Sequence, residues 1–240
     1  MKQYNKYLSN HLGKIHQGDK KDFLLMEKYF SKNYLKHLPK NKQSSIVDLG
    51  CGMGHFLYFL KKNGYKNHFG ADISQECVDF CRKKKLAKKT QLFSLNAEEF
   101  LKKGQQKFDI VIMNDLIEHI PKKKILTLLD LTGKKLKRKG KLIIKTINCA
   151  NPITGPSSRY LDFTHTTGFT EESLSQVLNM AGFREINIYP QDILVFNFLF
   201  NFLGRIGQGF LNLVFRFLFL LYGRKTTKIF TKDIIAVAQK

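Results

Sequence analysis

Residues 46–54 constrain the fold more than any other stretch of the chain, because an apolar segment runs directly into a carboxylate and three glycines at alternate positions. The segment reads Ile46-Val47-Asp48-Leu49-Gly50-Cys51-Gly52-Met53-Gly54. Glycine at every second position lets the backbone turn sharply without Cβ clashes, so main-chain N–H groups and the start of a following helix can approach a ligand closely. The segment therefore predicts a strand, a tight loop and a helix that together bind a small-molecule cofactor.

The spacing of these glycines differs from the dinucleotide-binding fingerprint, which has glycines at its first, third and sixth positions. Here the third glycine, Gly54, stands at the fifth position and His55 occupies the sixth. This spacing resembles that of the class I S-adenosylmethionine (SAM) methyltransferases, which implies SAM as the cofactor. Taken alone, the loop is also compatible with an ordinary glycine-rich turn between a strand and a helix.

Two further short strands follow in the order that this family requires. The first, His68–Ile73, carries Asp72, which lies 18 residues after Gly54. An acid at this place can accept hydrogen bonds from both ribose hydroxyls of a nucleotide-like cofactor. The second, Leu92–Leu95, leads into Asn96, which matches the position where the family places a polar side chain near the adenine.

The segment Phe108–Asp115 is apolar, too short for a helix and bounded by polar residues, and therefore predicts a buried strand of a parallel sheet. The chain continues into Glu118 and His119. This pair is similar to the one after the fourth strand in the small-molecule branch of the family, which includes the quinone-biosynthesis O-methyltransferases. A fifth strand, Lys141–Thr146, follows a predicted turn at Gly140.

These segments predict an α/β fold: a doubly wound, mostly parallel, seven-stranded Rossmann-like sheet with an antiparallel final hairpin and a hydrophobic helical insertion. The resemblance implies the final hairpin, from residues 185–189 and 233–238. With 240 residues, of which 43% are hydrophobic, the chain can bury one sizeable core. We expect a helical N-terminal cover in residues 1–42, a SAM-binding domain in residues 43–189 and 233–240, and the insertion in residues 190–232.

The resemblance to the family also implies which residues bind SAM. They lie in the glycine-rich loop and after the second, third and fourth strands. The expected cofactor-binding residues are Asp48, Gly50, Gly52, Gly54, Asp72, Ile73, Asn96, Ala97 and Asn114.

Four cysteines, Cys51, Cys77, Cys81 and Cys149, occur in a chain without a recognisable secretory signal, which favours reduced thiols in a cytoplasmic setting. Cys77 and Cys81 are one helical turn apart, but the sequence has no second cysteine pair with zinc-ligand spacing. We therefore expect core or surface cysteines and no metal site.

The chain carries a formal net charge of +22, from 41 Lys and Arg against 19 Asp and Glu, with basic runs at 82–85, 122–124 and 134–141. Such a field attracts polyanions, either nucleic acid or an anionic membrane surface. The alternative is that the basic runs are solvated helix faces, because they lie between predicted core elements rather than in one block.

Residues 193–222 contain eight phenylalanines, and apart from glycines their polar residues recur every three or four positions. At about 100° per residue, these polar residues form one stripe about 100° wide, which leaves an apolar arc broader than a soluble surface helix requires. Arg205 and Arg216 interrupt any uncharged spanning segment, so we expect the segment to lie in the membrane interface. Packing on the sheet and a homodimer contact are the alternatives. Glycines predict a break into two helices, at Gly204, Gly207 and Gly209.

The segment after the fifth strand is similar to one in methyltransferases that act on bacterial surface glycans and related small molecules. It reads Arg159-Tyr160-Leu161-Asp162-Phe163-Thr164-His165, followed by Phe169-Thr170. We expect a helix to start at Thr170 and to stop at Gly182, and the loop before it to roof the substrate pocket.

O-methylation needs an alkoxide-like nucleophile in line with the sulfonium methyl, and a neutral histidine within hydrogen-bonding reach of the hydroxyl is the natural base. His165 and His119 are the candidates for this base, and Asp162 is the candidate to orient it or to pair with its charge. The alternative is that both histidines bond loop backbone and that methyl transfer proceeds by proximity.

We therefore expect a SAM-dependent O-methyltransferase that acts on a small-molecule, glycan or lipid-linked acceptor, in the cytoplasm and peripherally at the inner face of the membrane. An RNA methyltransferase that uses the basic surface is the alternative. Against it, the chain lacks aromatic-basic interleaving, and its fourth strand lacks the Asn/Asp-Pro-Pro-aromatic signature of base-amino methylation.

Overall fold

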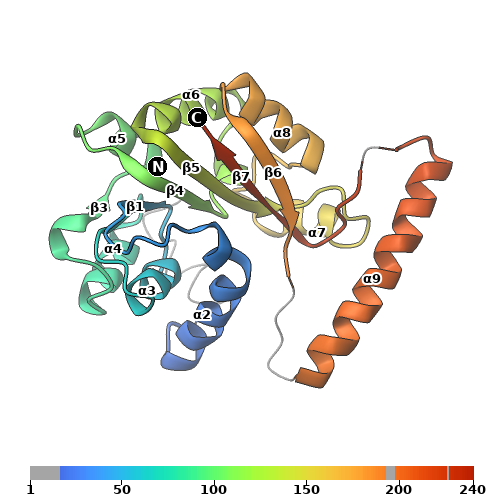
Figure 1. The fold of residues 1–240 in the computed structure, drawn as a ribbon, viewed down its shortest axis with the longest axis horizontal. Coiled ribbons are helices and arrows are strands. Elements are labelled where there is room, and N and C mark those ends of the chain that lie inside the picture. The colour runs from blue at the N-terminus through green and yellow to red at the C-terminus, as the bar shows by residue number, and fades with distance from the viewer. Residues whose placement is uncertain (1–16, 193–197, 226) are drawn as a thin grey trace. The chain divides into compact units, whose positions relative to one another are not determined.

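A computed structural model of the chain describes residues 17–192, 198–225 and 227–240. A seven-stranded sheet runs through it in the order β3-β2-β1-β4-β5-β7-β6 (Figure 1). The predicted α/β fold with a mostly parallel sheet and an antiparallel final hairpin is confirmed. The strands are β1 (Ile46–Leu49), β2 (His68–Asp72), β3 (Leu92–Ser94), β4 (Phe108–Asn114), β5 (Leu136–Ile147), β6 (Arg184–Pro190) and β7 (Asp233–Gln239).

Strand β1 is the centre of the parallel part, because it pairs with β2 on one side and with β4 on the other. Val47 is the register partner of Phe69 in β2 and of Val111 in β4. All four residues of β1 are buried, as expected for a parallel strand covered on both faces. Since parallel neighbours end at the same edge of a sheet, the loops after β1, β2 and β4 start side by side.

Four of the described helices begin where a side chain caps the first turn, at Asp19, Ser74, Asn96 and Thr170. Thr170 starts α8 as predicted, and Gly182 follows its end with a left-handed φ of 76°. The helices are α2 (Lys20–Tyr34), α3 (His55–Lys62), α4 (Gln75–Lys83), α5 (Ala97–Lys102), α6 (Lys122–Lys135), α7 (Thr154–Leu161), α8 (Glu171–Met180) and α9 (Phe198–Leu221), with short 3-10 turns η3 (Leu35–His37), η4 (Lys89–Gln91) and η5 (Ile117–His119).

The chain divides into two compact units. The first unit comprises Met1–Asn114, Asp130–Leu142 and Lys240, and the second comprises Asp115–Leu129 and Ile143–Gln239. Residues 1–16 of the expected N-terminal cover lie outside the described residues.

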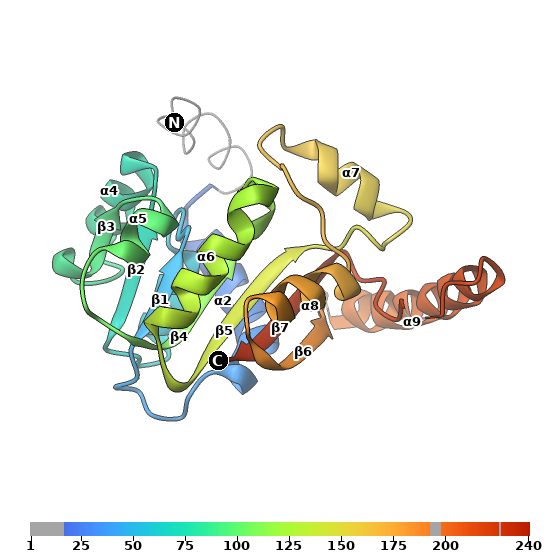
Figure 2. The ribbon, with the colours of Figure 1, turned by 90° about the horizontal axis from the view of Figure 1, so that it is seen from above.

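Each unit has its own buried apolar contacts. In the first unit the ring of Phe30 on α2 lies 4.9 Å from that of Phe56 on α3, between centroids. In the second unit α8 packs on β6 and β7, and Leu174 and Leu178 of α8 are fully buried (Figure 2). Aromatic and aliphatic burial of this kind is the main favourable term in folding.

Two segments of the chain differ from the sequence-based expectation. The predicted turn at Gly140 lies inside β5, because that strand begins at Leu136. Lys139 next to it takes a left-handed φ of 64°, so the irregular backbone is absorbed within the strand, as in a bulge. The expected loop before α8 contains α7, whose Pro156 stands in the first turn, where no intrahelical N–H bond is lost.

The predicted break of the hydrophobic insertion into two helices is wrong, because α9 is one continuous helix from Phe198 to Leu221. Among the residues that the structure describes, no atom lies within 4 Å of the Cβ position at Gly204, Gly207 or Gly209, so none of them packs into the glycine positions to divert the chain. Glycine costs about 1 kcal/mol per helical position, but the surrounding leucines and arginines are strong helix formers and no proline interrupts them. Residues 193–197 of the insertion lie outside the described residues.

Candidate functional site

The glycine-rich loop after β1 has a backbone conformation that glycine adopts most easily. Gly50, Gly52 and Gly54 have positive φ values of 73°, 49° and 77°. The N–H groups of Gly50 and Cys51 both donate to the carbonyl oxygen of Ala71 in β2, at 2.8 and 3.1 Å. The loop is thus tied to the neighbouring strand where β2 ends.

Asp72 ends β2 beside this loop. One of its carboxylate oxygens accepts a hydrogen bond from the Gly52 N–H at 2.8 Å, and the other accepts one from the Ser74 N–H at 2.8 Å. Burial raises the pKa of Asp72 above its usual value, while these two backbone bonds act in the opposite direction. A carboxylate has about four acceptor positions, so Asp72 has the capacity to accept two ribose hydroxyls as well.

Asp48 and Asn114 belong to the neighbouring strands β1 and β4. Asp48 is buried. The Asn114 side-chain oxygen accepts a hydrogen bond from the Tyr34 hydroxyl, and its Nδ2 has no hydrogen-bond partner among the residues that the structure describes. A buried amide donor of this kind is a group that a cofactor can satisfy.

Asn96, Ala97 and Ile73 are half-buried and follow β3 and β2, which are parallel neighbours. Asn96 caps α5, because its side-chain oxygen accepts a hydrogen bond from the Glu99 N–H at 2.9 Å. Its amide NH2 is the group that can face an adenine. The structure therefore gathers the predicted cofactor residues at the carboxyl ends of β1 to β4.

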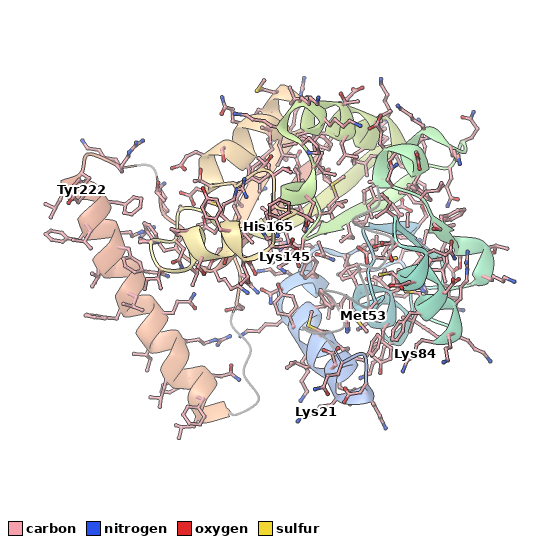
Figure 3. All side chains as sticks on the ribbon, turned by 180° about the vertical axis from the view of Figure 1, so that it is seen from behind. Lys21, Met53, Lys84, Lys145, His165 and Tyr222 are labelled. Carbon is pink, nitrogen blue, oxygen red and sulfur yellow. The ribbon has the colours of Figure 1, made fainter. Side chains whose placement is uncertain are left out.

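Gly18, Asp22 and His55 form a group that sequence reasoning missed. Asp22 accepts a hydrogen bond from the Gly18 N–H at 3.1 Å, and the same oxygen lies 2.9 Å from Nε2 of His55. A Cβ on Gly18 would lie 2.4 Å from Cε of Met53, so the chain before α2 lies against the glycine-rich loop (Figure 3). The histidine at the sixth position of the loop was the available signal for this contact.

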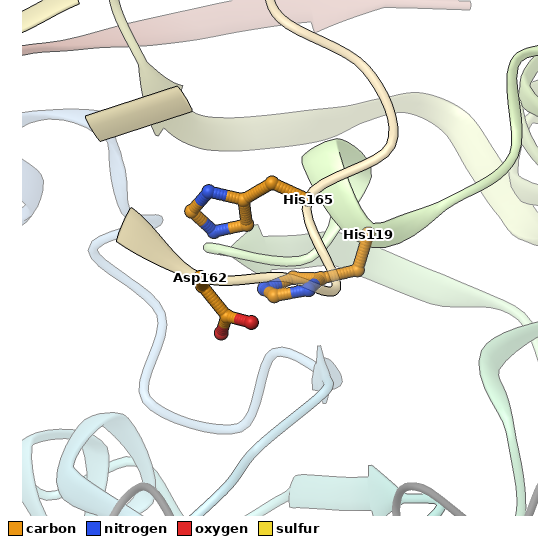
Figure 4. A group of neighbouring side chains, drawn as sticks. All are labelled: His119, Asp162 and His165. Carbon is orange, nitrogen blue, oxygen red and sulfur yellow. The ribbon is translucent and has the colours of Figure 1, made fainter. Parts of the chain in front are cut away.

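The second unit carries the predicted catalytic side chains, and the structure brings all three together. A nitrogen of His119, a nitrogen of His165 and a carboxylate oxygen of Asp162 lie within 4.8 Å of one another (Figure 4). The two imidazole centroids are 4.7 Å apart, with the ring planes at 63°. His119 belongs to η5, whereas the other two residues follow α7. We call this group the histidine cluster.

Thr164 links two members of the histidine cluster. Its hydroxyl donates to Oδ1 of Asp162 at 2.7 Å, and its N–H donates to the same oxygen at 2.8 Å. The hydroxyl oxygen also lies 2.8 Å from Nδ1 of His119. Because the single hydroxyl hydrogen goes to the carboxylate, Nδ1 of His119 is the donor in this contact, and the neutral ring carries its lone pair on Nε2.

His165 is fixed through both its ring and its backbone. Its Nδ1 lies 2.9 Å from the carbonyl oxygen of Ser158, so Nδ1 donates and Nε2 of the neutral ring carries the lone pair. The Arg159 guanidinium donates to the carbonyl oxygens of His165 and Thr166. The Thr166 N–H in turn donates to the carbonyl oxygen of Glu118 at 2.8 Å.

Burial is the main influence on ionisation around the cluster. It lowers the pKa of His119 to about 4, and the charge of His165 acts in the same direction, so the His119 ring is neutral near neutral pH. Burial and the nearby Asp115 raise the pKa of Glu118 to about 8. Glu118 accepts a hydrogen bond from the Thr146 hydroxyl at 3.0 Å in the interior of this unit.

Known proteins share both the sequence pattern and the fold. Residues 24–187 match the family model of a methyltransferase domain. The ubiquinone biosynthesis O-methyltransferase of Coxiella burnetii (strain Dugway 5J108-111) is 26% identical over 175 residues, which span 65% of this chain and 73% of that relative.

Solved structures support the fold. A SAM-dependent methyltransferase from Archaeoglobus fulgidus superposes with a TM-score of 0.67 at 21% identity, covering 95% of this chain and 98% of that one. Magnesium protoporphyrin IX methyltransferase from Synechocystis, solved with bound SAH, gives a TM-score of 0.61 at 16% identity and covers 100% and 97% of the two chains.

Proposed function

Because this chain belongs to the class I SAM-dependent methyltransferases, we propose that it transfers the methyl group of SAM to a hydroxyl of a small-molecule, glycan or lipid-linked acceptor at a membrane surface. The main observation in favour of a hydroxyl acceptor is the histidine cluster, in which two imidazoles and a carboxylate lie close together. The name of the Coxiella burnetii relative, an O-methyltransferase, supports the same choice of acceptor atom.

SAM supplies an electrophilic methyl group on a positively charged sulfur. The acceptor oxygen attacks this methyl carbon in line, the O–C bond forms as the C–S bond breaks, and the hydroxyl proton has to leave. A histidine whose pKa is about 4, as for His119, is a weak base, so His165 is the proposed proton acceptor. Asp162 is the proposed positioning residue for His119, to which Thr164 connects it.

Helix α9 supports an acceptor at a membrane surface. A soluble surface helix exposes its polar side, whereas α9 exposes its apolar side. Its uncharged polar residues Asn201, Gln208 and Asn212 are half-buried, its two arginines are exposed, and the side opposite the uncharged polar residues is apolar and exposed. Tyr222 follows its end and is also exposed (Figure 3). The exposed apolar residues include Leu199, Phe200, Phe202, Leu203, Ile206, Phe210, Leu213, Phe217, Leu220 and Leu221.

The hairpin that flanks α9 favours an interfacial helix over a spanning one. Leu199–Leu221 is long and apolar enough to cross a membrane by length and composition. However, Pro190 of β6 and Ile234 of β7 are register partners, so the chain leaves and re-enters the sheet at one place. A spanning α9, about 36 Å long at 1.5 Å per residue, would force the returning chain through hydrocarbon with unsatisfied backbone groups. Lying in the interface avoids this cost.

The side of α9 that faces its own unit is fixed by aromatic contacts. Phe215 and Phe219 lie 5.7 and 4.9 Å from Phe230, between ring centroids. The segment around Phe230 is held in turn by side-chain amides of Asn148 and Asn151, which donate to its carbonyl oxygens. These contacts leave the opposite, apolar side of the helix to the lipid.

The proposal is tested by following the methyl group. Purified protein is incubated with methyl-labelled SAM and with separated lipid, glycan and RNA fractions of a cell extract. We expect label in the lipid or glycan fraction as a base-stable ether. Label in RNA would contradict the proposal and favour the RNA methyltransferase, which the net charge of +22 makes the second candidate.

A further inference from the structure

We propose that His119, Asp162 and His165 bind a divalent transition-metal ion of the Mn²⁺ to Zn²⁺ series, and that this ion activates the acceptor hydroxyl. Two imidazoles with one carboxylate form a ligand set that suits these ions and leaves coordination positions open. The three donor atoms lie within 4.8 Å of one another (Figure 4). The role of the ion rests on the proposed function, whereas its binding does not.

The hydrogen bonds around the histidine cluster are those expected of a metal site. Both imidazoles donate through Nδ1, His119 to the Thr164 hydroxyl and His165 to the Ser158 carbonyl oxygen. This fixes the tautomer with the lone pair on Nε2, the atom that would coordinate the ion. Ligating histidines in proteins almost always have such a second hydrogen bond, which sets the ring orientation and raises ligand basicity.

Asp162 is held in the same way. Its Oδ1 accepts two hydrogen bonds from Thr164, one from the hydroxyl and one from the backbone N–H. Thr164 therefore orients a carboxylate and an imidazole of the cluster at once.

The spacing of the donor atoms is close to that around one ion. Ligands at about 2.1 Å from a tetrahedral Zn²⁺ stand roughly 3.4 Å apart. Because the donor atoms lie within 4.8 Å of one another, binding would draw them together by up to about 1.4 Å, which rotamer adjustments can supply. The backbone is already fixed, since the Thr166 and Thr167 N–H groups donate to the carbonyl oxygen of Glu118, next to His119.

A bound ion would activate the acceptor hydroxyl more strongly than an imidazole alone. A hydroxyl bound to a divalent cation would have a lowered pKa. With the ion in place, His165 would be a ligand and the hydroxyl proton would leave to solvent instead of to His165. The oxygen then takes the methyl group from the SAM sulfonium, the C–S bond breaks, and SAH leaves with the bonding electron pair on sulfur. The ion changes neither its charge nor its oxidation state.

Our expectation of no metal site rested on cysteine spacing, and the histidine cluster lies outside that argument. It combines residues that are far apart in sequence, His119 before β5 and the pair Asp162 and His165 after it. Neither Cys77 nor Cys81 belongs to it. Only the fold brings such a ligand set together.

The test measures metal binding without reference to activity. Full-length protein is stripped with a chelator and titrated with ZnCl2 by calorimetry, and the visible absorption bands of added Co²⁺ report the ligand geometry. We expect one equivalent to bind and to raise the melting temperature. Asp162→Asn and His165→Ala should each weaken binding by at least about 100-fold, and Thr164→Val by about 10- to 100-fold. SAM affinity should stay unchanged in all three variants, which shows that they fold.

His37→Gln serves as the matched control, because this half-buried histidine lies in η3 of the first unit and does not belong to the cluster. Loss of the metal in this control, or unchanged binding in the cluster variants, would overturn the inference, as would no binding of Zn²⁺ or Co²⁺. In each of these cases the proposed function survives, since His165 can then accept the proton directly. Metal binding without any transfer of label from SAM would instead overturn the proposed function.

Discussion

At Gly54 of the glycine-rich loop, a side chain would clash with its neighbours. Its φ is 77°, and a Cβ there would lie 2.5 Å from Cδ1 of Leu86 and 2.7 Å from Sγ of Cys81. Gly64 has nearly the same φ, 80°, but no atom of the described part of the chain lies within 4 Å of its Cβ position. The two glycines thus make the same conformational demand in different steric surroundings.

We predict that Gly54→Ala destabilises the protein more than Gly64→Ala. Both changes place a side chain in the left-handed region, at about 1–2 kcal/mol each. Gly54→Ala adds an overpacking cost of about 1–3 kcal/mol, because Leu86 and Cys81 belong to one buried cluster and have little room to yield. Urea unfolding of the two variants measures the difference. Equal losses would show that the space around Gly54 is not limiting.

The candidate residues of the site followed from the sequence more readily than their hydrogen bonds did. Asp72, His119, Asp162 and His165 were proposed from residue type, position and family resemblance. The hydrogen bonds that set their chemistry were not, because they come from Thr164, from the Ser158 carbonyl oxygen and from backbone N–H groups whose placement depends on the fold. A threonine in a loop carries no sequence signal that it will orient two other residues.

Among the elements, the strands followed from the sequence and α9 did not. The bounds of β1 to β4 were predicted to within one or two residues. For β4 the prediction came from an apolar run bounded by polar residues, the pattern that burial on both faces produces. The glycines of α9 suggested a break that does not occur, because helix propensity is a weak argument within a long apolar helix. The pattern also did not show that Phe215 and Phe219 pack on Phe230 rather than face outward.

We predict that the triple change Phe202→Ser, Phe210→Ser and Phe217→Ser releases the protein from anionic vesicles. These rings are between 54% and 65% exposed on the apolar side of α9. Removing three phenylalanines, each worth about 1.5–3 kcal/mol when buried, should weaken partitioning by more than about 100-fold. Vesicle sedimentation measures the effect.

Matched controls separate a membrane contact from general loss of apolar surface. Leu126→Ser and Met180→Ser remove exposed apolar side chains outside α9 and should leave vesicle binding unchanged. SAM affinity should be the same in all variants. Sedimentation of the triple variant at the wild-type level would show that the apolar side of α9 serves another contact, such as a second copy of the chain.

At the scale of the whole molecule, the net charge of +22 would add a second attraction to the proposed anionic membrane surface. Anionic lipid attracts each nearby Lys or Arg by about 1 kcal/mol, and this attraction falls off within a Debye length, about 10 Å at 0.1 M salt. Apolar insertion and charge together make the two signals that stable peripheral binding requires.

We therefore predict that vesicle binding rises with the fraction of anionic lipid and falls with salt. The expected loss is about 10-fold or more between 0.05 and 0.5 M salt, because exposed charges are screened while the apolar side of α9 is not. Neutral phosphatidylcholine vesicles provide the comparison. If vesicle binding depended on neither lipid charge nor salt, the basic runs would be solvated helix faces without a role in membrane binding.

The central claim is a division of labour, in which the first unit holds SAM and the histidine cluster acts on the acceptor. The most direct test measures the SAM dissociation constant by calorimetry and label transfer in the same preparations of two variants. Asp72→Ala should weaken SAM binding by about 10-fold or more, because it removes charged hydrogen bonds to the ribose. His165→Ala should keep SAM affinity within about 3-fold and lower transfer by about 100-fold or more. A His165→Ala protein that loses SAM affinity as Asp72→Ala does, or that transfers label at the wild-type rate, would contradict the account.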